Sequence, residues 1–295
     1  MTRSHALLWL VLFSGALLEL AACTAGSIGY CRAVTRLGDE AVYMLIGILA
    51  YSLLSGTLGI RLVSGLALAS SIVVALKVFT GLPRPPEDTW LVEASGPTFP
   101  SGHAALSAAF WTMVALYARS LPAALVGAVH TAAVSASRLV LNVHYPRDVV
   151  GGVIVGVAAA AVAYKASARR SAASAALLLG LAGLPLAAAA LAANPAYGAA
   201  ARLTGIDAGL VAVGAALARI GRAQESLETL RLWVRLLSLV VSFAALAAAL
   251  MLEEIGLLAG VAGFAAFTVV TALSRPLAAR LLGPGAKLVH GCYAA

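Results

Sequence analysis

Long apolar runs alternate with short polar segments along the whole chain. Most runs approach the about 20 residues that an α-helix needs to cross the hydrocarbon core of a bilayer. The pattern predicts an all-α, polytopic transmembrane helical bundle with ten spans. The run 205–220 contains Asp207 and is also typical of an amphipathic helix in the membrane interface, which would leave nine. The predicted spans are 6–22, 41–55, 62–80, 104–118, 122–140, 149–164, 171–192, 205–220, 236–252 and 255–274.

The composition leaves no room for a sizeable soluble domain. Of the 295 residues, 62% are hydrophobic and 11% are charged, whereas soluble domains carry about 25% charged residues. The mean hydropathy is +0.97. The net charge of +8 is spread over single basic residues and small groups between the apolar runs. This distribution argues against nucleic acid as a partner and favours an anionic lipid surface.

The lysines and arginines also indicate how the chain is oriented. If the N-terminus is cytoplasmic and all ten runs cross the membrane, most basic residues outside the motifs described below fall on the cytoplasmic side. This agrees with the excess of Lys and Arg in cytoplasmic loops of membrane proteins. We therefore expect a multi-pass protein of the cell membrane with both termini in the cytoplasm.

The cysteines allow two interpretations of the first loop. Cys23 and Cys31 flank a predicted outer loop and are placed to pair. Alternatively, the sequence ending at Cys23 is similar to a lipoprotein cleavage site after a short apolar stretch. Glu19 interrupts that stretch, and a first spanning helix fits the layout better.

Three polar segments stand out from the apolar background. The first runs from Lys77 to Pro85, the second is Pro-Ser-Gly-His at 100–103, and the third covers 137–148. In the predicted layout all three reach the extracytoplasmic surface. A single cation at a membrane end often only extends to the lipid headgroups. Several cations on one surface with two histidines and an aspartate instead indicate a shared site.

These segments resemble the three-part signature of the type 2 phosphatidic acid phosphatase family. The signature is Lys-x6-Arg-Pro, then Pro-Ser-Gly-His, then Ser-Arg-x5-His-x3-Asp, and this chain has each element in that order. The resemblance covers about residues 41–164. It implies a six-helix phosphatase core within 1–166, followed at 167–295 by about four additional spans of unknown role.

The residue types suit an anionic phosphoryl group. Phosphoryl transfer spreads negative charge over the equatorial oxygens, so catalysis rests mainly on positioning and charge stabilisation. Lys77, Arg84 and Arg138 can supply a positive cradle, the arginines through forked donors. Ser101 and Gly102 lie at a helix start, where free N–H groups and the helix dipole favour an anion.

The resemblance also implies the catalytic roles. His144 is the expected nucleophile and would form a phosphohistidine. Asp148 would accept a hydrogen bond from the other ring nitrogen of His144. His103 would protonate the leaving oxygen and later activate water. The resemblance implies no metal and no cofactor.

Several alternatives stay open from the sequence. The same signature occurs in vanadium-dependent haloperoxidases, which are soluble, and a lipid scramblase or transporter can retain a phosphate-binding site. Among phosphatase substrates, a polyprenyl diphosphate is slightly favoured over phosphatidate, phosphatidylglycerophosphate and a sugar phosphate. The sequence does not indicate the oligomeric state or the role of the added spans.

Overall fold

The computed structural model describes residues 3–219 and 230–281, and it confirms the predicted all-α bundle. The C-terminal end of the chain, with Cys292, lies outside the described residues. In chain order the elements are α1 (Arg3–Thr24), α2 (Ile28–Arg36), α3 (Glu40–Leu49), the π-helical turn η1 (Ala50–Leu54), α4 (Gly56–Thr80), the 3₁₀ turn η2 (Glu87–Thr89), α5 (Gly102–Ala118), α6 (Leu121–Val140), α7 (Pro146–Ser167), α8 (Ala172–Ala193), α9 (Gly198–Arg219), α11 (Leu232–Ile255) and α12 (Leu257–Leu281).

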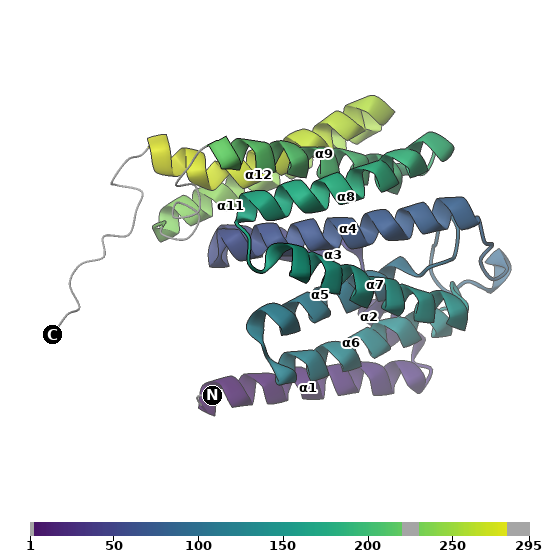
Figure 1. Cartoon of the computed structure of the whole chain (residues 1–295). Coiled ribbons are helices and arrows are strands. Elements are labelled where there is room, and N and C mark those ends of the chain that lie inside the picture. The colour runs from purple at the N-terminus through teal and green to yellow at the C-terminus, as the bar shows by residue number, and fades with distance from the viewer. Residues whose placement is uncertain (1–2, 220–229, 282–295) are drawn as a thin grey trace.

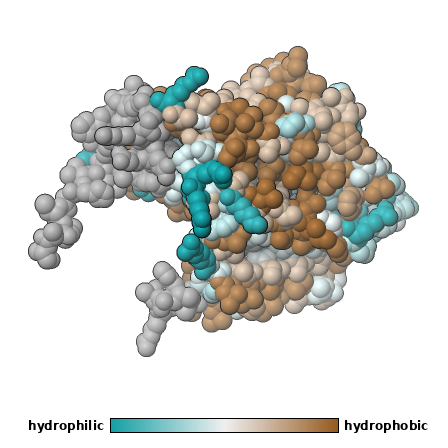
Figure 2. All heavy atoms as spheres, in the orientation of Figure 1, coloured by the Kyte–Doolittle hydropathy of each residue, from teal (hydrophilic) through white to brown (hydrophobic). Residues whose placement is uncertain are grey.

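The long helices lie side by side along one direction (Figure 1). Helix α1 begins and α12 ends at the same end of the bundle, and the connections from α4 to α5 and from α6 to α7 lie at the other end. Figure 2 shows apolar residues over the middle of one face and hydrophilic residues gathered toward its two ends. This is the distribution of a protein that spans a bilayer.

The number of spans differs from the predicted ten. Eight helices in the described ranges are long and apolar enough to cross a membrane, and nine if α2 and the α3–η1 segment form one span bent by 45°. The predicted span 41–55 is thus the second half of that bent pair. The predicted span 104–118 is α5, which has 17 residues because the chain before it forms a loop over 81–101. The run 205–220 belongs to the long helix α9, not to a helix lying in the interface.

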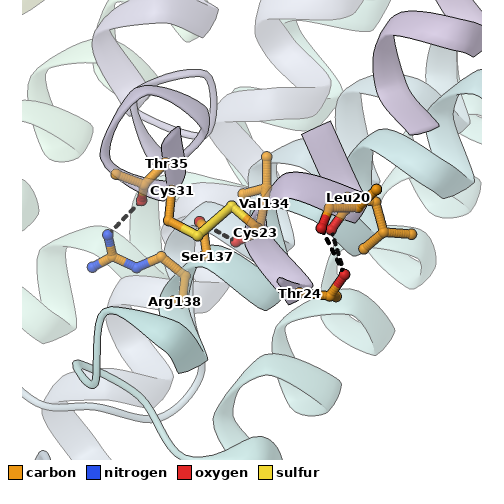
Figure 3. The surroundings of a disulfide bond; sticks show 9 residues. Leu20, Cys23, Thr24, Cys31, Thr35, Val134, Ser137 and Arg138 are labelled. Carbon is orange, nitrogen blue, oxygen red and sulfur yellow. Dashed lines mark hydrogen bonds between the residues drawn. A yellow bond between two sulfur atoms is a disulfide. The ribbon is translucent and has the colours of Figure 1, made fainter. Parts of the chain in front are cut away.

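A disulfide joins Cys23 of α1 to Cys31 of α2 (Figure 3). Both cysteines are fully buried, and the bond lies beside α6 next to Ser137 and Arg138. Of the two interpretations of Cys23, the structure therefore shows the pairing. The bond fixes α2 to α1, and α2 also packs on α6.

Each polar segment lies where a helix begins or ends. Lys77 is in the last turn of α4, which stops at Gly81 in the left-handed conformation (φ 58°), as helices ending in glycine often do. The Ser101 hydroxyl caps α5 by accepting the N–H of Ala104. Pro146 occupies the first turn of α7, where its missing N–H costs nothing.

The helices after α7 pack directly on the first half of the chain. Helices α8 and α9 both contact α4, and α12 contacts α9. A Cβ atom at Gly205 of α9 would lie 2.4 Å from the carbonyl oxygen of Val261 in α12, so glycine permits this close approach. Inside the bundle, the Ser71 hydroxyl of α4 donates a hydrogen bond of 2.7 Å to Asp207 of α9.

Candidate active site

The three polar segments meet around a cavity of about 770 Å³. Its lining includes the last turns of α4 and α6 and the first turn of α5. The loops from α4 to α5 and from α6 to α7 lie together at one end of the bundle (Figure 1). Six of the eight predicted site residues line it: Lys77, Arg84, Gly102, His103, Arg138 and His144. The other two, Ser101 and Asp148, are fully buried behind this lining.

His144 is oriented through both ring nitrogens. Its Nε2 atom lies 3.2 Å from a guanidinium nitrogen of Arg84, and its Nδ1 atom lies 3.1 Å from the Thr98 hydroxyl oxygen. Because arginine can only donate, Nε2 carries the lone pair and Nδ1 carries the proton. The lone pair of His144 therefore lies on the nitrogen beside a cation of the cavity.

Asp148 acts on His144 through Thr98. The expected direct hydrogen bond is absent, because Nδ1 of His144 lies 3.6 Å from the Asp148 carboxylate. Thr98 bridges the gap by donating its hydroxyl to the same carboxylate oxygen at 2.6 Å. That oxygen also accepts the N–H of Tyr145 at 2.7 Å, which caps the start of α7. Asp148 thus fixes the helix start and the histidine together.

Burial lowers the pKa of His144 far below its usual range, and the positive charges of Lys77 and Arg84 lower it further. The imidazole is therefore neutral at physiological pH. A neutral ring with a fixed tautomer is the form that acts as a nucleophile.

Backbone carbonyl groups of the loop before α5 hold two of the cations. The Lys77 ammonium donates to the carbonyl oxygens of Pro97 at 2.6 Å and Thr98 at 3.2 Å. The Arg84 guanidinium donates to those of Ser95 and Gly96 at 2.8 and 2.9 Å. Neutral carbonyl groups position the two cations without cancelling their charge, so the cavity keeps its attraction for an anion.

The third cation is held by α2. One terminal nitrogen of Arg138 donates to the Thr35 hydroxyl at 2.6 Å (Figure 3). The Nε atom of Arg138 is buried and has no hydrogen-bond partner among the described residues. Because a buried donor without a partner is costly, an anion in the cavity would stabilise this arrangement.

The start of α5 gives the cavity its backbone donors. The N–H of Ser101 donates to the carbonyl oxygen of Asp148 at 2.8 Å, so it is already used. The N–H groups of Gly102 and His103 are the first two of the helix and have no partner within it. A Cβ atom at Gly102 would meet only Val73, at 3.9 Å. No neighbouring atom of the protein therefore excludes a side chain at position 102. A glycine here instead leaves space for a ligand to approach the backbone.

His103 is paired with an acidic residue that has no place in the signature. Its Nε2 atom lies 2.7 Å from the carboxylate of Asp39, the residue before α3. Burial lowers the pKa of His103, and the hydrogen bond that its ring donates to Asp39 opposes this shift. Asp39 therefore favours the protonated ring, the form that can donate a proton.

Sequence reasoning missed Thr98, Asp39 and Thr35. Asp39 and Thr35 lie between the first two predicted spans, far from the three motifs in sequence. Thr98 lies in the loop before α5, outside the Pro-Ser-Gly-His element. Asp39 precedes a helix, which is a common place for aspartate, so its position gave no separate functional signal.

Residues 3–219 and 230–281 contain no group of three or more His, Cys, Asp and Glu side chains placed to hold a metal ion. The site described above is built from cations, backbone donors and two histidines. Such a set binds phosphate oxygens directly.

Comparison with known proteins agrees with the motifs. The PAP2 superfamily model matches residues 58–172, which include all three polar segments. Comparison with curated proteins gives no match. A transmembrane PAP2 type phosphatidylglycerolphosphate phosphatase from Bacillus subtilis is 22% identical over 55% of this chain and 93% of its own, with a TM-score of 0.41. Residues 58–172 of this polytopic membrane protein belong to the PAP2 superfamily.

Proposed function

We propose that the protein is an integral membrane phosphatase that hydrolyses a lipid phosphate or diphosphate through a phosphohistidine. The observation that carries the proposal is the neutral, buried His144, whose Nε2 lone pair lies beside the cationic cavity while Thr98 holds Nδ1. Neither lipid transport nor structural support requires a neutral histidine whose Nε2 lone pair lies beside a cationic cavity.

In the first step Nε2 of His144 attacks phosphorus, and the bond between phosphorus and the leaving oxygen breaks. The leaving oxygen takes a proton from His103, which releases the lipid alcohol or lipid monophosphate. Lys77, Arg84 and Arg138 stabilise the charge on the equatorial oxygens, with the N–H groups at the start of α5. The positive charge that develops on His144 is balanced by Asp148 through Thr98.

In the second step water attacks the phosphorus of the phosphohistidine. His103, now neutral, accepts a proton from the water, and the bond between phosphorus and Nε2 breaks to release inorganic phosphate. Both histidines return to their starting states. Every proton in the cycle is carried by His103 or water, so we propose that the reaction needs neither a metal nor a cofactor.

We propose that the site faces the extracytoplasmic side. The Cys23–Cys31 disulfide lies beside Arg138, at the same end of the chain's fold as the cavity. Disulfides persist in oxidising compartments and are rare in the cytosol. The basic residues support the same orientation, with both termini in the cytoplasm.

For the substrate we favour a polyprenyl diphosphate, with phosphatidate and phosphatidylglycerophosphate as the competing lipids. The cavity of about 770 Å³ and its several cations can accept a doubly phosphorylated head.

The test is phosphate release by the purified protein in detergent with EDTA, from each of these lipids and from a hexose phosphate. We expect release from at least one lipid, absent in His144→Ala. Release only after a divalent metal is added would contradict the metal-independent mechanism. The absence of release from every substrate would favour a scramblase or transporter.

Replacement of Asp39 by asparagine tests how His103 is tuned. Loss of the carboxylate removes the interaction that raises the pKa of His103, so the pKa falls. Because His103 acts as an acid in its protonated form, the decline of kcat at high pH should move to lower pH. The loss at neutral pH should be smaller than the about 10²- to 10⁴-fold contribution of a complete general acid.

The matched control is Asp88→Asn, which removes an exposed carboxylate from the loop between α4 and α5. Its pH profile should equal that of the unmodified protein. If Asp39→Asn lowers kcat equally at every pH, Asp39 does not tune His103.

A further inference from the structure

We propose that a groove between the first half of the chain and helices α9 and α12 binds a single hydrocarbon chain of the lipid substrate. The inference rests on the proposed phosphatase function and assigns a role to the added helices. It names the substrate class as a phosphate or diphosphate ester of one long chain, such as a prenyl diphosphate.

The groove is a second, narrower cavity of about 120 Å³. Its walls are α3, η1 and α4 on one side and α9 and α12 on the other, with Leu106 of α5. Most of the lining is aliphatic or aromatic, for example Val63, Ile206 and Phe267. A surface of this kind favours hydrocarbon over water.

The groove adjoins the phosphate cavity. Glu40, Ser70, Leu106 and Leu203 line both. We infer that a ligand with its phosphate beside His144 passes between these shared residues to place its chain in the groove. Glu40, at this junction, is paired with Arg202 of α9, so its negative charge is compensated.

The length of the groove matches one lipid leaflet. Along α4 it extends from Ser70 to Gly59, eleven residue steps, or about 16 Å at 1.5 Å per step. The hydrocarbon core of a bilayer is about 30 Å thick, so a chain reaching its midplane covers about 15 Å. A chain that starts at the interface would thus be enclosed over most of its depth in the membrane.

A contact between the two halves of the molecule lies at the far end of the groove. The hydroxyl of Tyr51 in η1 donates to the carbonyl oxygen of Ala272 in α12 at 2.7 Å. A Cβ atom at Gly59 would lie 2.4 Å from the Cα atom of Tyr51, which brings η1 close to α4. This contact should set an upper limit on the chain length that fits.

The small volume of the groove favours one hydrocarbon chain over two. A glycerophospholipid carries two chains, and only one would find a place in the groove. The proposal therefore predicts that a one-chain diphosphate is hydrolysed with higher kcat/KM than phosphatidate.

The experiment places a phenylalanine at the far end. Ala272→Phe is compared with Ala266→Phe, the same change at an exposed position of α12. The substrates are farnesyl diphosphate and dimethylallyl diphosphate, which share a head and differ in chain length. We expect Ala272→Phe to lower kcat/KM for farnesyl diphosphate at least about tenfold. Activity on the short substrate should stay unchanged, which also shows that the variant folds. Ala266→Phe should change neither.

A binding measurement separates the groove from the chemistry. A prenyl diphosphate with a photoreactive group at the end of its chain should label the groove residues of α4 or α12, and Ala272→Phe should abolish this labelling. Labelling without phosphate release from any substrate would overturn the proposed phosphatase function and leave the groove standing. Phosphate release with equal losses on both substrates, or with labelling outside the groove, would overturn the groove proposal alone.

Discussion

Replacement of His144 by alanine is expected to reduce phosphate release by about four orders of magnitude or more, as for other enzymes that lose a nucleophile. The side chain is buried, neutral and held through Thr98, so no other described group is placed to attack phosphorus from the same position. Lys77 and Arg84 would remain and still bind the substrate. The loss should therefore appear in kcat, with a smaller change in KM.

The matched control is His130→Gln in α6, outside the cavity. His130 is hydrogen bonded to Glu19 at 2.8 Å, and glutamine can keep that bond. This variant should retain full activity. The phosphohistidine is labile in acid, so the reaction with a radiolabelled substrate is quenched in alkali. The label should then stay on the unmodified protein and be absent from His144→Ala. If His144→Ala stays within about tenfold of the unmodified activity, His144 is not the nucleophile.

Replacement of Asp148 by asparagine should lower kcat by about 10⁴-fold, the effect seen when the aspartate that orients a catalytic histidine loses its charge. The carboxylate oxygen accepts hydrogen bonds from Thr98 and from the N–H of Tyr145. Asparagine keeps one acceptor oxygen for these hydrogen bonds. The thermal midpoint should therefore change little while the imidazolium loses its compensating charge.

The variant Thr98→Val separates the effect of the bridging Thr98 hydroxyl from the effect of the Asp148 charge. It removes the hydroxyl between His144 and Asp148 but leaves the carboxylate in place, so kcat should fall less than in Asp148→Asn. An equal loss would indicate that the bridge carries the whole effect of Asp148. Full activity of Asp148→Asn would contradict the proposed role of that residue.

The meeting of the three motifs at one end of the bundle could be predicted, because it depends only on the order of the helices along the chain. Lys77 ends one long helix, and Gly102 and His103 begin the next, so the loop over 81–101 between them leaves all three at the same end of the bundle. The Ser-Arg-x5-His-x3-Asp element likewise bridges α6 and α7. Hydrophobic periodicity and motif spacing contain this information.

The partners of these residues could not be predicted, because they depend on the paths of loops. Whether Asp148 reaches His144 directly or through Thr98 is decided by less than an ångström in the placement of a loop. The pairing of Asp39 with His103 requires α2 and α3 to fold back over α5, and no spacing in the sequence encodes that. The predicted span 104–118 corresponds to α5, which begins two residues earlier, at Gly102.

The two histidines and one wall of the groove come from different parts of the chain. The PAP2 superfamily match ends at residue 172, whereas Leu203, Ile206 and Phe267 follow it. The two histidines thus lie within the match, whereas one wall of the groove, formed by α9 and α12, lies after it. Mutations in α9 or α12 can alter the accepted lipid while the histidines stay under unchanged selection. Over evolutionary time, such an arrangement lets one chemistry be applied to new membrane lipids by exchange of the C-terminal helices.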